Sequence, residues 1–243
     1  MKVQELSGSE RKAAVESMFN SIAWRYDFLN HFLSFGIDRV WRRKTIRLVG
    51  RTHHPEAILD VATGTADLAI AALKLNPRKV TGIDISEKML EIGREKVRRK
   101  GLHEKIELLP GDSEHIDFKD NTFDVVMVAF GVRNFSDPLT GLSEMRRVTR
   151  PGGLVVILEF SKPVSFPMKQ LYAVYFNRIL PFFGKLFSKD KSAYRYLPES
   201  VMRFPDNEAF IALLSEAGFT GSVQKRLSGG IASIYSGIKP VMQ

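Results

Sequence analysis

The strongest constraint on the fold of this chain is the stretch ILDVATGTAD, from Ile58 to Asp67. It begins as a short apolar run that ends in Asp60, passes through a tight turn at Gly64 and continues as the helical pattern DLAIAALKL. A strand, a close turn and a helix N-terminus in this order are typical of the edge at which an open α/β sheet binds a nucleotide-like cofactor. The stretch therefore predicts an α/β fold with a cofactor at this turn.

The same pattern continues along the chain. Five apolar runs, ILDVA, KVTGID, KIELLP, FDVVMVAF and LVVILEF, alternate with helical patterns over residues 57–160. This alternation predicts a parallel sheet with helices on both faces, and the segment RPGG at residues 150–153 is expected as a turn into the fifth strand. Two short strands, near Ser222–Leu227 and Ile231–Gly237, would form a closing hairpin. We therefore expect a mostly parallel sheet of seven strands.

Two segments lie outside this pattern. Residues 1–50 read as two helices and would form an N-terminal cap, and residues 163–205, which are rich in Phe, Tyr and Leu, would form a helical insertion before the last helix. The cofactor-binding core would span residues 51–162. Residues 206–243 would complete it with a C-terminal helix and the hairpin, so we expect a single structural domain made of these four parts.

Acidic residues end or follow three of the predicted strands. Asp60 ends the first strand, Asp84 ends the second, and Asp112 follows the third together with Ser113. Parallel strands bring their carboxyl ends to one edge, so these carboxylates would repel one another unless a ligand with hydroxyl groups and positive charge lay among them. Asp84 stands where a carboxylate accepts hydrogen bonds from a ribose. For Asp60 and Thr65 alone, helix capping and turn formation remain the simpler interpretation.

The turn also indicates which cofactor fits. The sequence ATGTAD lacks the spaced glycines that let a pyrophosphate approach a helix N-terminus, which disfavours a dinucleotide. S-adenosylmethionine offers ribose hydroxyls and a cationic sulfonium but no phosphate. It therefore suits acidic strand ends beside one glycine turn, and we expect it as the cofactor.

Composition disfavours several other classes of protein. The chain has no cysteine and its five histidines show no ligand spacing, so we expect no metal site. It contains neither a GxSxG elbow nor a P-loop motif, which argues against a hydrolase or a P-loop enzyme. The polar N-terminus lacks the apolar core of a signal peptide, and polar residues interrupt the apolar segment Leu171–Phe187. We expect a soluble, cytoplasmic protein.

The net charge of +9 includes two basic runs, within residues 39–51 and 94–100. Helical spacing makes both runs mainly solvated faces, which is the simplest interpretation. A nucleic acid or an anionic membrane surface would also suit them, and charge alone does not decide between these two. Because the insertion is aromatic and apolar rather than basic, we expect no nucleic-acid partner.

Five motifs make the chain similar to the ubiquinone/menaquinone biosynthesis C-methyltransferase family over nearly its whole length. They are YDFLN at 26–30, FGVRNFSD at 130–137, RVTRPGGLVVILEFSKP at 147–163, YRYLPES at 194–200 and FPD at 204–206. The chain departs from the family at Asp38, where histidine is usual, and at Ala66, where glycine is usual. Alanine would need only a modest adjustment there if its φ were negative.

The resemblance implies a class I S-adenosylmethionine-dependent methyltransferase fold, which is Rossmann-like. It also implies a set of cofactor-binding residues in the loops after the first three strands: Asp60, Gly64, Thr65, Asp84, Asp112 and Ser113. Asp84 would bind the ribose, Asp112 and Ser113 the adenine, and Thr65 the methionine end. Gly64 would permit close backbone approach, and Asp60 would support the loop from below.

The resemblance further implies C-methylation of a polyprenylated quinol ring, and we favour the conversion of demethylmenaquinol to menaquinol. The benzoquinol intermediate of ubiquinone biosynthesis stays open as the alternative. Arg133 would stabilise the phenolate or polarise a water that takes the proton, and Asn134, Tyr194 and Tyr196 would orient the ring. Less favoured functions are an RNA methyltransferase and a non-catalytic scaffold.

A prenylated substrate needs room for its tail. The first helix, with Met18, Phe19, Ile22, Trp24 and Tyr26, and the apolar insertion would line such a channel, and core packing alone is the alternative. Basic faces near its opening would favour peripheral contact with the inner face of an anionic membrane. The sequence leaves the oligomeric state open, a homodimer included.

Overall fold

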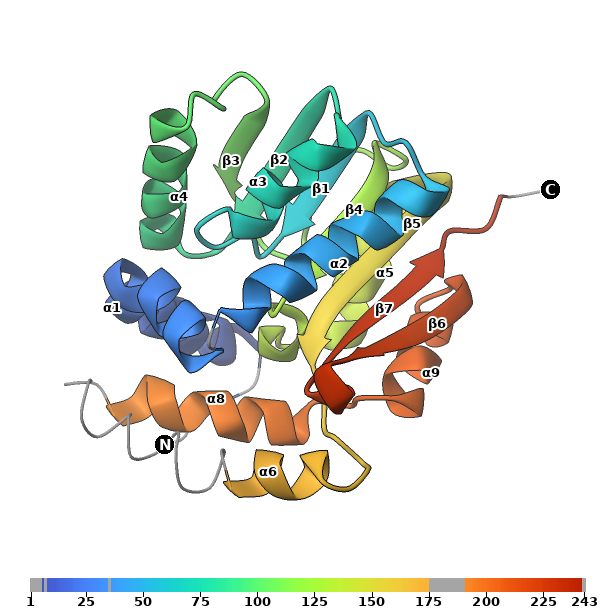
Figure 1. Cartoon of the computed structure of the whole chain (residues 1–243). Helices are drawn as coiled ribbons and strands as arrows, with labels where there is room; N and C mark the ends of the chain where they lie inside the picture. The colour runs from blue at the N-terminus through green and yellow to red at the C-terminus, as the bar shows by residue number, and fades with distance from the viewer. Residues whose placement is uncertain (1–5, 7, 35, 175–190, 242–243) are drawn as a thin grey trace.

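The computed structural model describes residues 6, 8–34, 36–174 and 191–241. Its centre is a seven-stranded sheet in the order β3-β2-β1-β4-β5-β7-β6 (Figure 1). The neighbours from β3 to β5 pair in parallel, and β7 pairs antiparallel with both β5 and β6. The strands are β1 (Ala57–Val61), β2 (Lys79–Asp84), β3 (Ile106–Pro110), β4 (Phe123–Ala129), β5 (Thr149–Phe160), β6 (Thr220–Leu227) and β7 (Ala232–Ile238).

Helices cover both faces of this sheet (Figure 1). The helices α2, α3 and α4 pack on one face, and α5 and α9 pack on the other. Three more helices, α1, α6 and α8, lie beyond the carboxyl ends of the parallel strands. The described helices are α1 (Gly8–Leu33), α2 (Ile37–Thr52), α3 (Asp67–Ala72), α4 (Glu87–Arg99), α5 (Pro138–Val148), α6 (Met168–Val174), α8 (Lys191–Arg203) and α9 (Glu208–Glu216), with short turns η2 (Leu73–Leu75), η3 (Val132–Asn134) and η5 (Ser228–Gly230).

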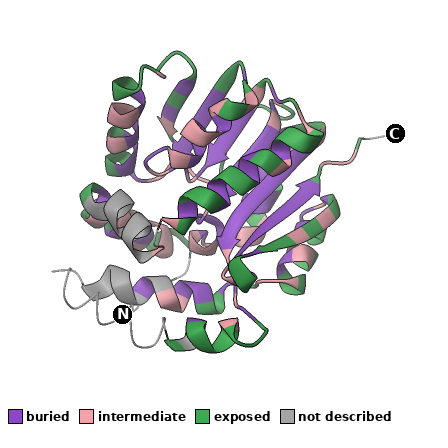
Figure 2. Cartoon of the chain, viewed as in Figure 1, coloured by how far each residue is buried: buried purple, intermediate pink, exposed green. Residues whose placement is uncertain are grey.

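The apolar strand runs are explained by burial on both faces of the sheet. Successive strand residues point to opposite faces, so Ile58 packs with α2 and α3 whereas Leu59 packs with α5. The central strands are accordingly buried along most of their length (Figure 2). Polar side chains can then reach solvent or a ligand only where the strands end, and this places the site at the carboxyl edge.

The structure confirms the predicted α/β fold, with its mostly parallel seven-stranded sheet. Local capping explains why two predicted helices begin where they do: Ser86 Oγ accepts a hydrogen bond from Met89 N at 3.3 Å, and Asp137 Oδ1 accepts one from Leu139 N at 3.0 Å. Each oxygen satisfies a backbone donor that the first turn of a helix leaves without a partner.

The expected turn at residues 150–153 is wrong in one respect. Strand β5 already begins at Thr149, which pairs with Phe123, and regular pairing resumes at Leu154 opposite Val125 after a register shift. Gly152, with a φ of 76°, lies within this irregular stretch. The glycines therefore bend a strand instead of ending one.

Part of the apolar segment Leu171–Phe187 lies outside the described residues. Within the described part of the chain, no helix is long and apolar enough to cross a membrane.

Candidate functional site

The turn after β1 contains residues with left-handed backbone angles. Ala62, Gly64 and Ala66 have φ values of 51°, 56° and 68°, respectively. Thr63 N donates a hydrogen bond to Ile83 O of the neighbouring strand at 2.9 Å. Residues other than glycine rarely adopt such angles, and they do so mainly at sites where the surrounding structure holds them. The turn is therefore a strained segment that is fixed against the end of β2.

Ala66 does not meet the condition under which only a modest adjustment was expected, because its φ is positive. An L residue in this region costs about 1–2 kcal/mol that glycine does not pay, although glycine loses more entropy on folding. We expect Ala66→Gly to raise the free energy of unfolding by about 0.5–1 kcal/mol in urea denaturation. The matched control, Ala69→Gly inside α3, should lower it by about 1 kcal/mol. A destabilised Ala66→Gly variant would show that the turn is not strained at this position.

Asp84 holds the turn at the end of β2. Its Oδ2 accepts a hydrogen bond from Gly64 N at 2.8 Å, and its Oδ1 accepts one from Ser86 N at 2.8 Å. Burial raises the pKa of Asp84 to about 6, although these backbone donors favour its charged form. The backbone of Ile85 also stabilises the ionised carboxylate, and Asp84 still lines the cavity, where a ligand can reach it. Near neutral pH, Asp84 is an ionised acceptor that faces the site.

Asp60 and Thr65 lie behind the turn. Asp60 is 1% exposed and accepts a hydrogen bond from the Thr63 hydroxyl at 2.7 Å. Burial raises its pKa to about 7. The Thr65 hydroxyl accepts a hydrogen bond from Lys96 Nζ at 3.1 Å. Thr65 does not cap α3, which begins after Ala66 without a side-chain cap from that residue, whereas the backbone N–H of Ala69 in the first turn of α3 stabilises the ionised form of Asp60. Neither Asp60 nor Thr65 is among the residues that line the cavity.

A cavity of about 690 Å³ opens at this edge of the sheet. Its walls come from α1 and from the loops after β1, β2, β3 and β4. The lining residues are Lys12, Val15, Phe19, Ala62, Gly64, Asp84, Ile85, Met89, Gly111, Asp112, Ser113, Glu114, Ala129, Phe130, Gly131, Asn134, Phe135 and Ser136.

The structure brings together four of the six cofactor residues suggested by the sequence, namely Gly64, Asp84, Asp112 and Ser113. Gly64 and Asp84 meet at one part of the wall through their hydrogen bond, and Asp112 and Ser113 follow β3. The carboxylates supply acceptors for hydroxyl and amino donors and a negative field for a cation. This arrangement suits a ligand with a ribose and a positive charge.

Lys12 is a site residue that the sequence did not single out. Its Nζ lies 2.6 Å from Asp112 Oδ2 and 3.0 Å from Glu114 Oε2. Burial opposes its charge, but the hydrogen bonds to these two carboxylates outweigh this effect and raise the pKa of Lys12. The available signal was spacing, because Lys12, Val15 and Phe19 recur at helical intervals and all line the cavity.

Asn20 joins α1 to the loop after β2. Its Oδ1 accepts hydrogen bonds from Ser86 Oγ at 2.7 Å and from Lys88 N at 3.4 Å. Ser86 N in turn donates to Asp84. The first helix therefore contacts both the Asp84 and the Asp112 sides of the cavity and covers it.

Phe19, expected along a channel for the tail, lines this cavity, whereas Trp24 is 71% exposed and the side chain of Tyr26 lies outside the described residues.

Arg133 forms a buried ion pair. Its Nη1 lies 2.7 Å from Glu159 Oε1, and the two side chains are only 6% and 0% exposed. The same Nη1 donates to Phe130 O, and the guanidinium lies 5.3 Å from the centre of the Phe160 ring. Arg133 does not line the first cavity but lines a second one beside it, of about 520 Å³. The positive charge of Arg133 thus lies next to the first cavity, behind residues such as Asn134 that line it.

Asn134 and Tyr196 are in direct contact. Asn134 lines the first cavity, and its Oδ1 accepts a hydrogen bond from the Tyr196 hydroxyl at 3.1 Å. Burial raises the pKa of Tyr196, which favours the neutral hydroxyl that donates this bond. Tyr194 belongs to the same helix, α8, but its side chain lies outside the described residues.

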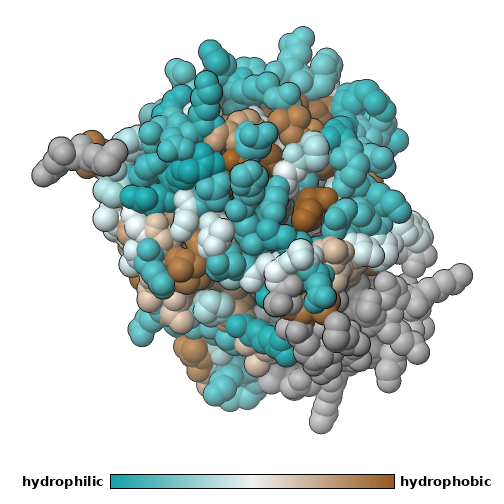
Figure 3. Space-filling view, turned by 180° about the vertical axis from the view of Figure 1, so that it is seen from behind, coloured by the Kyte–Doolittle hydropathy of each residue, from teal (hydrophilic) through white to brown (hydrophobic). Residues whose placement is uncertain are grey.

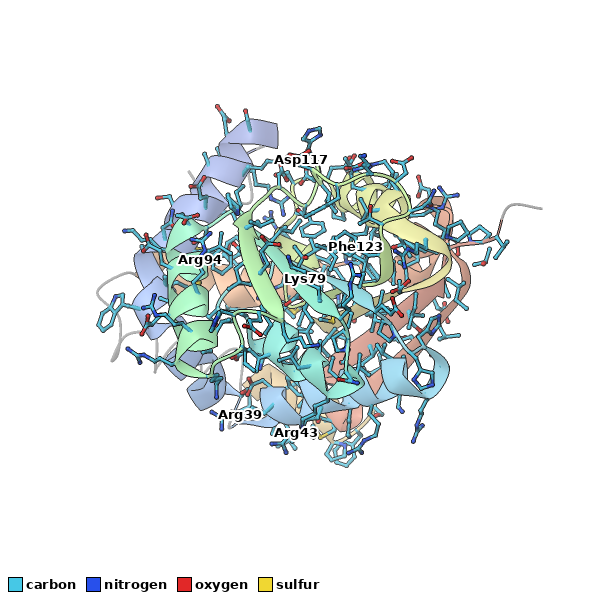
Figure 4. The ribbon with its side chains drawn as sticks, turned by 90° about the horizontal axis from the view of Figure 1, so that it is seen from above. Arg39, Arg43, Lys79, Arg94, Asp117 and Phe123 are labelled. Carbon is cyan, nitrogen blue, oxygen red and sulfur yellow. The ribbon has the colours of Figure 1, made fainter. Side chains whose placement is uncertain are left out.

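The basic runs lie mostly on the surface. Arg39 and Arg43 of α2 are exposed at the outer edge of the molecule (Figure 4). Arg42 is the exception: it is buried and pairs with Asp38, which also accepts a hydrogen bond from Ser34 Oγ at 2.7 Å. The aspartate that replaces the usual histidine is therefore part of a buried ion pair. Among the described residues, no cluster of His, Cys, Asp and Glu is arranged to hold a metal ion.

Comparisons with known proteins agree with this geometry. Residues 6–239 match the model of the ubiE/COQ5 methyltransferase family. The chain is 48% identical to a demethylmenaquinone methyltransferase of Bacteroides fragilis, over 98% of each chain. It is 46% identical to a ubiquinone/menaquinone biosynthesis C-methyltransferase of Geobacter sulfurreducens, over 95% of this chain and 90% of the relative.

Solved structures share the fold at low identity. A SAM-dependent methyltransferase from Thermotoga maritima has a TM-score of 0.64 at 20% identity and covers 93% of this chain and 99% of its own. One from Aquifex aeolicus has a TM-score of 0.58 at 22% identity and covers 80% and 89%. These similarities confirm the class I methyltransferase fold. The chain belongs to the ubiE/COQ5 methyltransferase family and is an enzyme whose methyl donor is S-adenosylmethionine.

Proposed function

We propose that this enzyme methylates a ring carbon of a polyprenylated quinol and converts demethylmenaquinol to menaquinol. The observation that carries the proposal is the cavity at the carboxyl edge of the sheet, where Asp84 and Asp112 face the Asn134–Tyr196 pair. Relatives at 45–48% identity are named demethylmenaquinone methyltransferase, which supports this substrate.

The cofactor would lie between the loops after β2 and β3. Asp84 would accept hydrogen bonds from the ribose hydroxyls, and Asp112 with Ser113 would bind the adenine. Gly64 would leave room for the ligand beside the backbone, while Asp60 and Thr65 would hold the turn from behind. When bound, S-adenosylmethionine would supply a methyl group to the ring carbon next to an ionised hydroxyl as the sulfur departs, and that carbon would then lose its hydrogen as a proton to water so that the ring regains its aromaticity.

The chain's contribution is to position the ring and favour its ionised form. Arg133 is a fixed positive charge behind the wall of the cavity, and Glu159 and Phe130 O hold it in place. Asn134 can donate from its amide nitrogen to a ring oxygen while Tyr196 holds its amide oxygen. Tyr194, in the same helix as Tyr196, would complete the ring site. These roles predict that substitutions here lower turnover more than cofactor affinity.

A competition assay tests the choice of ring. The enzyme would receive S-adenosylmethionine with equal amounts of demethylmenaquinol and the demethylated benzoquinol, and mass spectrometry would identify the products. We expect methylated naphthoquinol as the main product. The benzoquinol is the second candidate because relatives such as that of Geobacter sulfurreducens are named for both pathways. Methylation of added RNA instead of either quinol would contradict the proposal.

We also propose that the protein works in the cytoplasm in contact with the inner face of the membrane, where a prenylated quinol resides. Apolar side chains are exposed on and before α6, where Phe166 is 81% and Leu171 is 59% exposed. Lys169 of α6 is also exposed, and a cation beside apolar groups suits an anionic lipid surface. By contrast, the face seen in Figure 3 is mostly hydrophilic, with hydrophobic residues in small groups.

Vesicle flotation tests this contact. We expect the double substitution Phe166→Ser and Leu171→Ser to weaken binding to anionic vesicles by about tenfold, because each loses part of the roughly 2 kcal/mol gained by burying such a side chain. The control is Val223→Ser, which changes an apolar residue 57% exposed on β6 and should have no effect. Wild-type protein that fails to float with anionic vesicles would contradict the proposal. Sedimentation equilibrium would show whether the protein is also a homodimer.

A further inference from the structure

The second cavity, of about 520 Å³, lies beside the first and has a different chemistry. Its described lining consists of three arginines, a serine, two prolines and a phenylalanine: Arg11, Arg133, Arg203, Ser200, Pro138, Pro205 and Phe204. These residues come from α1, η3, the start of α5, the end of α8 and the loop after it. The described lining thus combines positive charge with apolar surface and contains no carboxylate.

Two of these arginines have unused donors. Arg11 Nε and Arg133 Nε are both buried without a hydrogen-bond partner among the described residues. A buried donor without a partner costs roughly 1–3 kcal/mol and is often explained by a bound ligand or water. Glu159 pairs with Arg133, and Arg11 has no carboxylate within ion-pair distance among the described residues. A ligand with an anionic oxygen would satisfy these donors.

The second cavity lies next to the proposed methylation site, because consecutive residues line the two. Arg133 lines the second cavity and its neighbour Asn134 lines the first. Arg11 Nη2 donates to Arg133 O at 3.5 Å. The Tyr196 hydroxyl donates to Asn134, and the charges of Arg11 and Arg133 both act to lower the pKa of Tyr196. A ring held at Asn134 would therefore have an oxygen within reach of this cationic wall.

We propose that the second cavity binds the ionised ring hydroxyl of the substrate, with Arg11 as a positioning residue beside Arg133. The inference rests on the proposed function and extends it to Arg11 and Arg203. The prolines and Phe204 favour an aromatic oxyanion over inorganic phosphate, which requires a more uniformly polar surface. The hydroxyl gives its proton to water, and the oxygen left behind carries the negative charge.

The expected consequence is a lower pKa for the bound hydroxyl. The charged and titratable groups that face this position are Arg11 of α1, Arg133 of η3, Glu159 of β5, and Tyr196 and Arg203 of α8. Three of these groups are cationic and one is anionic near neutral pH. Their combined field stabilises the oxyanion over the neutral hydroxyl.

The test uses 4-nitro-1-naphthol, whose absorbance reports whether its oxygen is ionised. Bound to the wild-type enzyme with S-adenosylhomocysteine, its apparent pKa should fall by about one unit relative to the free probe. Arg11→Gln should remove most of this shift and weaken binding of the anion by about tenfold, while the neutral 1-methoxy-4-nitronaphthalene binds as before. Arg11→Lys should keep most of the shift because it keeps the charge.

The matched control is Arg99→Gln, which removes an arginine 77% exposed on α4 and should leave probe binding unchanged. If Arg11→Gln does not fold, as judged by circular dichroism, Arg203→Gln takes its place with the same expectation.

An unshifted probe pKa in the wild type, or an equal shift in Arg11→Gln, would overturn the inference. Inorganic phosphate that binds without competing with the probe would also overturn it. Loss of methyl transfer alone would concern the proposed function, since probe binding requires no turnover.

Discussion

Replacing Asp84 by alanine is expected to weaken binding of S-adenosylmethionine by about a hundredfold or more, because hydrogen bonds to a charged group contribute about 1.5–3 kcal/mol each and a ribose has two hydroxyl donors. The substitution also removes the acceptor that fixes Gly64 N and Ser86 N. Isothermal titration calorimetry measures the change directly.

The matched control for this experiment is Asp117→Ala. Asp117 is exposed in the loop after β3 and lies at the outer edge of the molecule (Figure 4). Its removal deletes one exposed carboxylate without touching the cavity, so the dissociation constant should stay unchanged. If Asp84→Ala binds the cofactor as tightly as the wild type, Asp84 is not the ribose-binding residue.

The raised pKa of Asp84, about 6, adds a pH dependence. Cofactor affinity should fall as the pH drops through about 6, because the protonated carboxyl loses much of its strength as an acceptor. The folding stability of the apo protein changes with pH in the opposite direction to the cofactor affinity. Burial raises the pKa values of Asp60 and Asp84 above their unfolded values, so the stability they contribute is present below about pH 4 and lost as the pH rises to about 7. The melting-temperature gain on adding S-adenosylhomocysteine should therefore grow between about pH 5 and about pH 8.

Replacing Arg133 by alanine is expected to lower the free energy of unfolding by about 3–5 kcal/mol, because it leaves Glu159 buried without its cationic partner. Glu159 is completely enclosed and, among the described residues, would keep its backbone hydrogen bonds from Arg133 N and Phe160 N. Urea denaturation at neutral pH measures the loss.

A double substitution separates this structural role from catalysis. Arg133→Gln with Glu159→Gln removes both charges and allows a neutral hydrogen bond, so it should recover most of the lost stability. Turnover should remain at least about tenfold below wild type if the charge of Arg133 acts on the substrate. A folded Arg133 variant with full turnover would show that Arg133 has only a structural role.

The cofactor side of the site was predictable because its signals are local. Asp84 follows an apolar run at a fixed distance from the Gly64 turn, and the parallel sheet brings the two together in a hydrogen bond. The direction in which the Thr65 side chain points, away from the cavity, was not predictable in the same way. Thr65 lies between Gly64 and Ala66, which both have left-handed backbone conformations, and its hydroxyl bonds to Lys96 and does not line the cavity. No residue propensity predicts alanine at a positive φ.

The residues contributed by α1 depend on long-range packing. Arg11, Lys12 and Asn20 lie on one helix, and their partners are about 65 to 120 residues away in the sequence. Helical periodicity predicts that the helix exists but does not show which part of the sheet it covers. The second cavity was missed for this reason, because its arginines come from three segments that meet only in the folded chain.

The transfer of a labelled methyl group tests the central claim most directly. Wild-type enzyme, S-adenosylmethionine with a trideuterated methyl group, and demethylmenaquinol would be incubated together, and the product analysed by mass spectrometry and proton NMR. We predict one trideuteriomethyl group on a ring carbon in place of one hydrogen, and loss of this product in Asp84→Ala. A label found on oxygen, or no transfer by an enzyme that binds S-adenosylmethionine, would contradict the proposal that the enzyme is a quinol C-methyltransferase.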